Sequence, residues 1–403
     1  MSTVKNAIVM SDLHLGRPTS YLHIGNAQYA YNQAELAAVL RRLGPQDEVV
    51  INGDFMELSL IDIKRIYPDV RAFFSTLAQA GPFQRLVYIP GNHDHHYWRY
   101  LSEQVYEKTI MHLPEGADSR TYPDFHVDMR YSSRSNRQTC TISLAELWPP
   151  NYPMPEFIVK YPHHLIRNQA DGKNYLFTHG HFLEDRFRPV DLVIEPAHLE
   201  ELEAFNNIWL EAFDYHLGHA GRFSDTVLKL LEHYEKGGKE AREHIKAVTN
   251  EIQTNMKTKL KLNRFYSCML KLGFKLMLKK VPLERKSGLL GQPLTGELQQ
   301  SIQSYIDKYL LQRYTKEMIR ELHLICESDL PVPFIFVFAH THRPVTDISG
   351  KNAVMVRNAS FPILNTGGWV NADECGSYAG ENAGILAIHE KGFTWESMAG
   401  RLK

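Results

Sequence analysis

The sequence predicts an α/β fold that is interrupted by a large helical insertion. Short apolar runs end abruptly in polar clusters at five places. Between the first two of these runs, apolar residues recur at the spacing of a helix. In contrast, residues 192–328 carry several helical stripes and almost no strand pattern. We therefore expect one domain built from residues 1–191 and 329–403, with residues 192–328 inserted into it as a lid or an interaction subdomain.

The first third of the chain is predicted to alternate strands with helices. Apolar runs at residues 7–10, 49–51 and 86–89 show no alternation, which is typical of strands buried on both faces. Four apolar residues at helical spacing indicate a helix between the first two runs: Leu36, Val39, Leu40 and Leu43. A second helical pattern covers residues 62–80. This order of elements predicts a parallel sheet.

The later elements are less regular. Residues 115–155 are polar and rich in proline, which indicates loops around a short strand, and residues 156–181 resemble a hairpin that turns at Asp171 and Gly172. The helical stripes of the insertion include Leu202, Phe205, Trp209 and Phe213, and also Leu298, Ile302, Tyr305 and Tyr309. Strands return at residues 334–338 and continue to the end of the chain.

Composition excludes several classes of protein. Charged residues at 23%, apolar residues at 43% and a net charge of -1 describe an ordinary globular chain. The first ten residues do not resemble a signal peptide, and no apolar stretch is long enough for a membrane span. The four cysteines form no CxxC pair, so reduced thiols and a cytoplasmic location are expected rather than a zinc ribbon or a disulfide framework.

The five polar clusters follow predicted strands directly. They read SDLHLG, NGDFMEL, PGNHDHH, THGHFLE and AHTHRP, and we expect them at one edge of one sheet, where α/β folds place their sites. Asp12 and His14 would project from the same face of an extended strand and could share a cation. Taken singly, Asp54 could equally be a helix cap, and each histidine could be structural. Together the clusters supply nitrogen and oxygen donors for two adjacent ions, and the lack of thiolates favours Mn²⁺, Fe, Zn²⁺ or Co²⁺.

The ordered set DxH, GD, GNHD, HGH and HTH resembles the calcineurin-like metallophosphoesterase family over residues 6–98, 173–183 and 334 to about 370. The resemblance implies a double β-sandwich flanked by helices, and two divalent metal ions, Mn²⁺ before the others. It further implies that Asp54 bridges two ligand sets, which are Asp12, His14 and His342 for one ion and Asn92, His179 and His340 for the other. Ala339 departs from the family pattern, which often has glycine there.

The implied activity is hydrolysis of a phosphoester or pyrophosphate by a metal-bridging hydroxide, with His93, beside Asp94, assisting the leaving group. The motifs also resemble pyrophosphatases acting on UDP-diacylglucosamine, but those are shorter and usually have Arg at the position of His93, so that substrate is not assigned. His95, His96, His181 and Arg343 are expected to support the ligands or to contact the phosphorylated substrate.

A basic segment suggests further partners. Residues 256–286 hold ten Lys or Arg against Glu284, a local charge of +9, so the remainder of the chain carries -10. Such a segment can contact an anionic membrane, nucleic acid or the substrate, or it can be a packed helix with a solvated face. A nuclease, a lipid-linked pyrophosphatase and a scaffold without activity are therefore alternatives. The oligomeric state and the native metal stay open.

Overall fold

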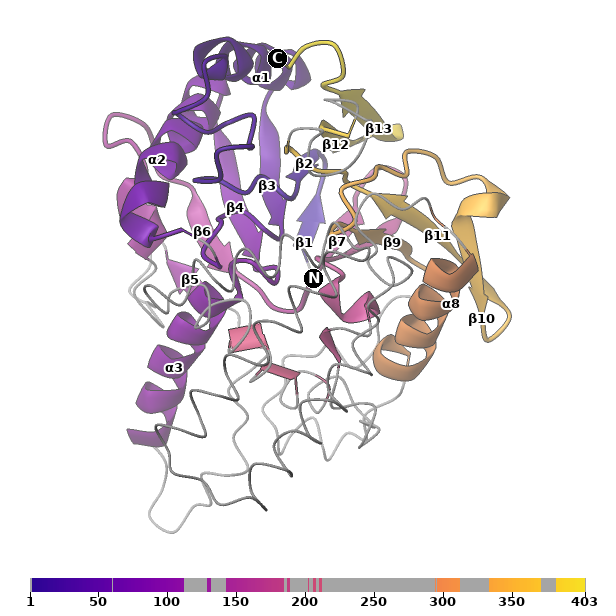
Figure 1. Cartoon of the computed structure of the whole chain (residues 1–403). Coiled ribbons are helices and arrows are strands. Elements are labelled where there is room, and N and C mark those ends of the chain that lie inside the picture. Colours follow the sequence, from indigo (N-terminus) through magenta and orange to yellow (C-terminus); the bar gives the residue numbers. More distant parts are fainter. Residues whose placement is uncertain are drawn as a thin grey trace, which may run out of the picture.

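The computed structural model consists of two mixed β-sheets that pack face to face between helices (Figure 1). This is the double β-sandwich that the family resemblance implied. The structure describes residues 2–59, 61–111, 129–131, 143–184, 187–188, 202, 206–207, 210–211, 294, 296–311, 333–370 and 382–402. The basic segment 256–286 and most of the predicted insertion lie outside these residues, so the predicted boundaries at 192 and 328 stay predictions.

The first sheet has seven strands, in the order β13 (Gly392–Ser397), β12 (Gly384–His389), β2 (Ala7–Met10), β3 (Gln46–Asn52), β4 (Phe83–Ile89), β6 (Glu156–Val159) and β5 (Met129–Tyr131). Strands β2, β3, β4 and β6 are parallel to their neighbours in this series. Helices α1 (Tyr29–Leu43) and α2 (Ile63–Ala80) connect β2 to β3 and β3 to β4. The alternation predicted for the first third of the chain is therefore confirmed.

The second sheet has six strands, in the order β1 (Ser2–Val4), β7 (His163–Asn168), β8 (Asn174–Thr178), β9 (Ile335–Phe338), β11 (Ala359–Asn365) and β10 (Ala353–Val356). Strands β7 and β8 form the predicted hairpin, and Gly172 adopts a φ of 69° in its turn. The start of that segment was predicted wrongly, because β6 pairs with β4 in the other sheet. The expectation of a single sheet was also wrong, since β8 and β9 belong to the second one.

The core between the sheets follows from the period of two in each strand. Val9, Val50 and Val87 face the second sheet and share a buried cluster with Phe177 and Val337. Their neighbours along the strands point the other way and pack under α1 and α2: Ile8, Val49 and Leu86. Strands buried on both faces explain why these apolar runs show no alternation.

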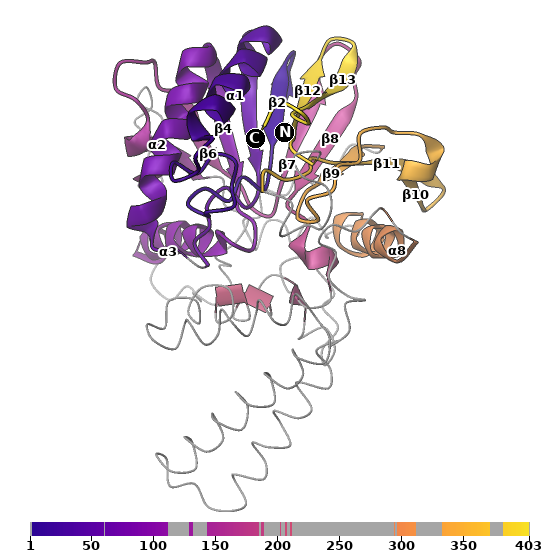
Figure 2. The same ribbon diagram turned by 45° about the horizontal axis from the view of Figure 1, so that its top comes forward.

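Further helices flank the sandwich on both sides (Figure 2). Helix α3 (His95–Met111) begins inside the polar cluster after β4, and α8 (Gly296–Tyr305) continues as the π-helical turn η7 (Ile306–Leu310). The predicted stripe of α8 is confirmed, because Leu298, Ile302, Tyr305 and Tyr309 are buried. In the other stripe Leu202 is buried, and its remaining members lie outside the described residues. Short 3-10 helices are η2 (Ser143–Leu147), η3 (His181–Leu183) and η8 (Gly350–Asn352).

Among the residues that the structure describes, no helix combines the length and the apolar character that a bilayer crossing requires.

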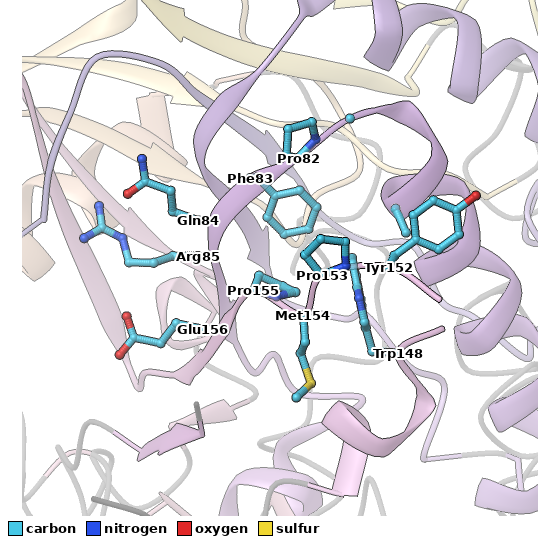
Figure 3. A pocket seen from close by; sticks show the side chains of 12 residues that line it. Pro82, Phe83, Gln84, Arg85, Trp148, Tyr152, Pro153, Met154, Pro155 and Glu156 are labelled. Atoms are coloured by element: carbon cyan, nitrogen blue, oxygen red, sulfur yellow. The ribbon is translucent and has the colours of Figure 1, made fainter. Parts of the chain in front are cut away.

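A cavity of about 810 Å³ opens beside the start of β4 and β6. Figure 3 shows its lining, in which Phe83, Trp148 and Pro153 lie close together. The cavity is at the amino ends of these parallel strands, whereas the polar clusters follow their carboxyl ends. It is lined by no histidine or aspartate. The candidate site therefore lies elsewhere.

Candidate metal centre

The polar clusters meet where strands of both sheets end. Asp12 and His14 follow β2, Asp54 follows β3, and Asn92 follows β4 of the first sheet. From the second sheet, His179 follows β8, and His340 and His342 follow β9. All seven side chains are buried. Residues that are up to 330 positions apart in the sequence are thus brought together by the packing of one sheet on the other.

Most of these residues have an unusual backbone conformation. Positive φ angles occur at Asp12 (49°), His14 (44°), Asp54 (46°), His340 (67°) and His342 (55°). Within the described part of the chain, Arg357 and Asn358, in the turn between β10 and β11, are the other non-glycine residues with positive φ. The expectation that Asp12 and His14 lie in an extended strand was therefore wrong. Such strain is retained at functional sites when the surrounding structure holds it in place.

Neighbouring glycines leave room for the side chains of the cluster. A Cβ atom added at Gly53 would lie 2.0 Å from His179 Nδ1, and one at Gly91 would lie 2.2 Å from Asp54 Oδ1. A Cβ atom at Gly368 would lie 2.8 Å from His342. These close approaches explain why the GD and GN motifs need glycine.

The first group of donors consists of Asp12, His14, Asp54 and His342. His14 Nε2 lies 3.1 Å from His342 Nε2 and 3.6 Å from Asp54 Oδ2. His342 Nε2 lies 3.3 Å from Asp12 Oδ1. Two imidazole nitrogens and two carboxylates thus converge in a space closed to solvent.

The second group consists of Asp54, His179 and His340, and Asn92 joins it. His179 Nε2 lies 3.3 Å from Asp54 Oδ2 and 3.1 Å from Asn92 Oδ1. The rings of His179 and His340 meet edge to face with centroids 5.1 Å apart. Asp54 belongs to both groups, so the two donor sets share one carboxylate.

The spacing of the donors fits divalent metal ions. Nitrogen or oxygen ligands that are roughly 2.1 Å from one ion, at angles between octahedral and tetrahedral, lie roughly 3.0–3.4 Å from each other. The distances of 3.1 Å, 3.3 Å and 3.3 Å between donors fall in this range. Mixed carboxylate, imidazole and amide donors suit Mn²⁺, Fe, Zn²⁺ or Co²⁺.

Two of the histidines are held through Nδ1, while their Nε2 atoms face the other donors. His14 Nδ1 lies 3.0 Å from Glu57 Oε2, and His179 Nδ1 lies 3.4 Å from the Asn52 carbonyl oxygen. Such contacts fix the orientation and the tautomer of a ligand imidazole. His340 Nε2 lies 3.4 Å from Glu184 Oε1, within ion-pair distance but without a hydrogen bond between the two atoms. Sequence reasoning missed Glu57 and Glu184. The available signal was that each lies at or next to the end of a quoted cluster, Glu57 in NGDFMEL and Glu184 in THGHFLE.

His93 lies beside the donors without belonging to the two shared groups. Its ring centroid is 4.8 Å from that of His14, and its side chain is 26% exposed. The His93 backbone N–H donates to Asp54 Oδ1 at 2.9 Å, while His93 Nδ1 lies 2.7 Å from Glu57 Oε1. Glu57 therefore holds both His14 and His93. The three form a further cluster of potential ligands, although the short contacts through Nδ1 favour a hydrogen-bonded arrangement.

Asp94 was predicted to be catalytic together with His93. Its carboxylate is buried and accepts backbone N–H groups from Gly91 at 2.5 Å, Phe55 at 2.6 Å and Met56 at 3.1 Å. These contacts tie the loop after β3 to the loop after β4. They indicate that Asp94 holds these two loops in position. A catalytic role for Asp94 stays a prediction.

The acidic donors are ionised because imidazoles surround them. Burial opposes the charge of Asp54, but the attraction of His179 and His93 holds its pKa well below the usual range. Burial likewise opposes the charge of Glu57, and His93 and His14 keep its pKa well below the usual range. Burial lowers the pKa of His14, which favours the neutral imidazole that a metal ion requires.

The other predicted contacts lie around this centre. His95 Nδ1 and His96 Nδ1 lie 2.6 Å and 2.7 Å from the two oxygens of Glu211, a residue of the predicted insertion. His181 Nε2 lies 3.2 Å from the Tyr161 hydroxyl, and burial holds the His181 pKa well below its usual range. Arg343 follows His342 and is half-buried.

The comparisons with known proteins agree with this geometry. The chain matches no curated protein. A family model described as calcineurin-like phosphoesterase matches residues 6–248, which include the loops after β2, β3, β4 and β8. His340 and His342 lie beyond the matched residues. In the structure they belong to the same donor groups as the matched residues Asp12, His14, Asp54 and His179. Because the match covers more than half of the chain, the protein belongs to the calcineurin-like phosphoesterase family of metal-dependent phosphoester hydrolases.

Proposed function

We propose that the protein hydrolyses a phosphoester or pyrophosphate bond with two divalent metal ions. Asp12, His14 and His342 would hold one ion, Asn92, His179 and His340 would hold the other, and Asp54 would bridge them. The observation that carries this proposal is the sharing of Asp54 by two buried donor groups. A carboxylate with donors on both sides suits a pair of ions better than a single one.

The two ions would lower the pKa of a water molecule, and their positive charge would stabilise the negative charge on the phosphoryl oxygens. The protein's own part is to fix the donors and to manage the proton of the leaving group. Glu57 contacts His93 through Nδ1, and the other ring nitrogen, Nε2, would carry the proton that is given up. The negative charge of Glu57 favours the imidazolium form of His93, as the third member of a catalytic triad does for its histidine.

Metal-stimulated turnover tests the proposal. Protein freed of metal with a chelator is assayed with Mn²⁺ on 4-nitrophenyl phosphate and on bis(4-nitrophenyl) phosphate. Turnover should return with Mn²⁺, and His93→Ala should lower kcat by about 10²–10⁴-fold without loss of bound metal. If no phosphoester is hydrolysed with any divalent ion by the folded protein, or if His93→Ala matches the wild type, the proposal is wrong.

A half-buried histidine outside the donor groups provides the matched control. His389 ends β12 beside the amino end of β2, whereas Asp12 and His14 follow the carboxyl end of β2. The variant His389→Ala should keep the wild-type kcat, which separates a loss of the His93 side chain from a general effect of removing an imidazole.

A further inference from the structure

Ser59 places a buried hydroxyl group beside His93, and the proposed function does not use it. We propose that Ser59 is a positioning residue, which together with Glu57 holds the His93 imidazole in the orientation and the tautomer that proton transfer to the leaving group requires. This inference rests on the proposed function, because it needs His93 to act on the leaving group.

Ser59, Glu57 and His93 form a closed triangle of hydrogen-bonding atoms. Ser59 Oγ donates to Glu57 Oε1 at 2.5 Å and lies 2.7 Å from His93 Nδ1, while His93 Nδ1 lies 2.7 Å from the same Glu57 oxygen. Glu57 and Ser59 follow β3, whereas His93 follows β4, so the triangle joins two loops. Both Glu57 and Ser59 are buried, and hydrogen bonds that are shielded from water in this way are stronger than exposed ones.

The triangle determines which ring nitrogen of His93 carries a fixed proton. The Ser59 hydroxyl has one proton, and it points to Glu57 Oε1. Ser59 therefore presents lone pairs to His93 Nδ1, as the carboxylate oxygen also does. Without a proton, Nδ1 would place its own lone pair 2.7 Å from each of two acceptor atoms. Nδ1 is therefore protonated, and proton transfer to the leaving group is assigned to Nε2.

Contact with Glu57 alone would fix one atom of the imidazole and leave its plane less restricted. The His93 side chain is 26% exposed, so packing does not fully enclose the ring. Ser59 adds a second acceptor at the same nitrogen, which restricts rotation of the ring about its bond to Cβ. Proton transfer depends strongly on such alignment, because a small misplacement of a catalytic group costs a large part of the rate.

A double-mutant cycle tests whether Ser59 acts through His93. Wild type, Ser59→Ala, His93→Ala and the double variant are loaded with Mn²⁺ and assayed on 4-nitrophenyl phosphate and bis(4-nitrophenyl) phosphate. Ser59→Ala should lower kcat by about 3–20-fold, within the range for one lost hydrogen bond, and should change KM by less than about twofold. In the His93→Ala background, Ser59→Ala should change kcat by less than about twofold, because no imidazole is left to position.

Two further variants and a structural measurement complete the test. Ser59→Thr keeps the hydroxyl group and should stay within about threefold of the wild-type kcat. Ser102→Ala is the matched control and should keep the wild-type kcat, because Ser102 is also buried but its hydroxyl donates to the Arg99 carbonyl of the same helix at 2.9 Å. In crystals of the metal-free proteins, the His93 side chain should have one conformation in wild type and more than one in Ser59→Ala.

The outcomes separate this inference from the proposed function. An unchanged kcat in Ser59→Ala, an equal loss with and without His93, or an unchanged His93 conformation in the Ser59→Ala crystal would overturn the assignment of Ser59. A Ser59→Thr variant that loses as much activity as Ser59→Ala would also overturn it. Failure of wild type on both substrates would instead contradict the proposed function, and this inference with it. Thermal melting and bound metal must match wild type in each variant that is compared.

Discussion

At the scale of single residues, the centre depends on side chains that contact the donors as well as on the donors themselves. Glu57 is fully buried and holds His14, His93 and Arg17, so one carboxylate links a proposed ligand, the proposed acid and a cation. No periodicity marks such a residue, because a glutamate three positions after Asp54 can as easily face solvent. The seven proposed ligands were predicted from strand-end motifs, whereas Glu57 and Glu184 became visible through their contacts.

Glu57→Gln tests this link at the level of one functional group. The amide keeps the shape but loses the charge that favours a protonated His93, so kcat should fall by about 10–100-fold, with weaker binding of Mn²⁺. Steady-state kinetics and metal titration give both values. Glu396→Gln, which removes the half-buried partner of the exposed Arg42, should leave them unchanged. Unchanged kcat and metal affinity in Glu57→Gln would show that Glu57 only fills space.

Gly53→Ala tests whether the close packing around His179 is required. The new methyl group would lie 2.0 Å from His179 Nδ1, so the ring must move and metal binding should be lost. Gly172→Ala is the matched control, because Gly172 also has a positive φ of 69° but no atom within 4 Å of an added Cβ. Both variants should lose about 1–2 kcal/mol from the left-handed conformation. Full metal loading of Gly53→Ala would contradict the geometry.

At the scale of elements, loops between strands and helices carry the chemistry while the strands hold it in place. Continuous apolar runs predicted β2, β3, β4, β8 and β9, because a strand buried on both faces has a purely local signature. The sheet that each strand joins was not predictable in the same way. Strands β8 and β9 pair across more than 150 residues, and β6 leaves the expected hairpin for the other sheet. Those pairings depend on long-range packing.

Helix α3 is joined to the predicted insertion by Glu211, and this contact makes stability depend on pH. Hydrogen bonds from His95 and His96 outweigh burial and lower the Glu211 pKa from 4.5 to about 2. Between these pH values the unfolded chain binds more protons than the folded one, so the contribution of Glu211 to stability is present above pH 4.5 and is lost as the pH falls toward 2.

Urea unfolding of metal-free wild type and Glu211→Gln between pH 6 and pH 3 measures this contribution. The difference in unfolding free energy should be largest at pH 6 and should shrink as the pH falls. A difference that is constant over this range would show that the ionised form of Glu211 is not what the two histidines stabilise.

At the scale of the whole molecule, the proposed centre exists only because two sheets pack on each other. The first sheet supplies Asp12, His14, Asp54 and Asn92, and the second supplies His179, His340 and His342. Each motif alone is equally compatible with a helix cap or a structural histidine. The sequence pattern also predicted, wrongly, that all five strand ends lie on one sheet. The donors and their two sets that share Asp54 were therefore predictable from the order of the motifs and the family resemblance, while the way in which two different sheets bring these sets together required the three-dimensional fold.

Metal bound per chain tests this account most directly. Folded protein that is freed of metal, reloaded with Mn²⁺ and desalted should hold two ions per chain by elemental analysis, and Asp54→Ala should hold fewer than one while it stays folded. Loss of the shared carboxylate weakens both donor sets at once. A folded wild-type chain that binds no Mn²⁺, Fe²⁺, Zn²⁺ or Co²⁺, or an Asp54→Ala variant that still holds two ions, would contradict the account.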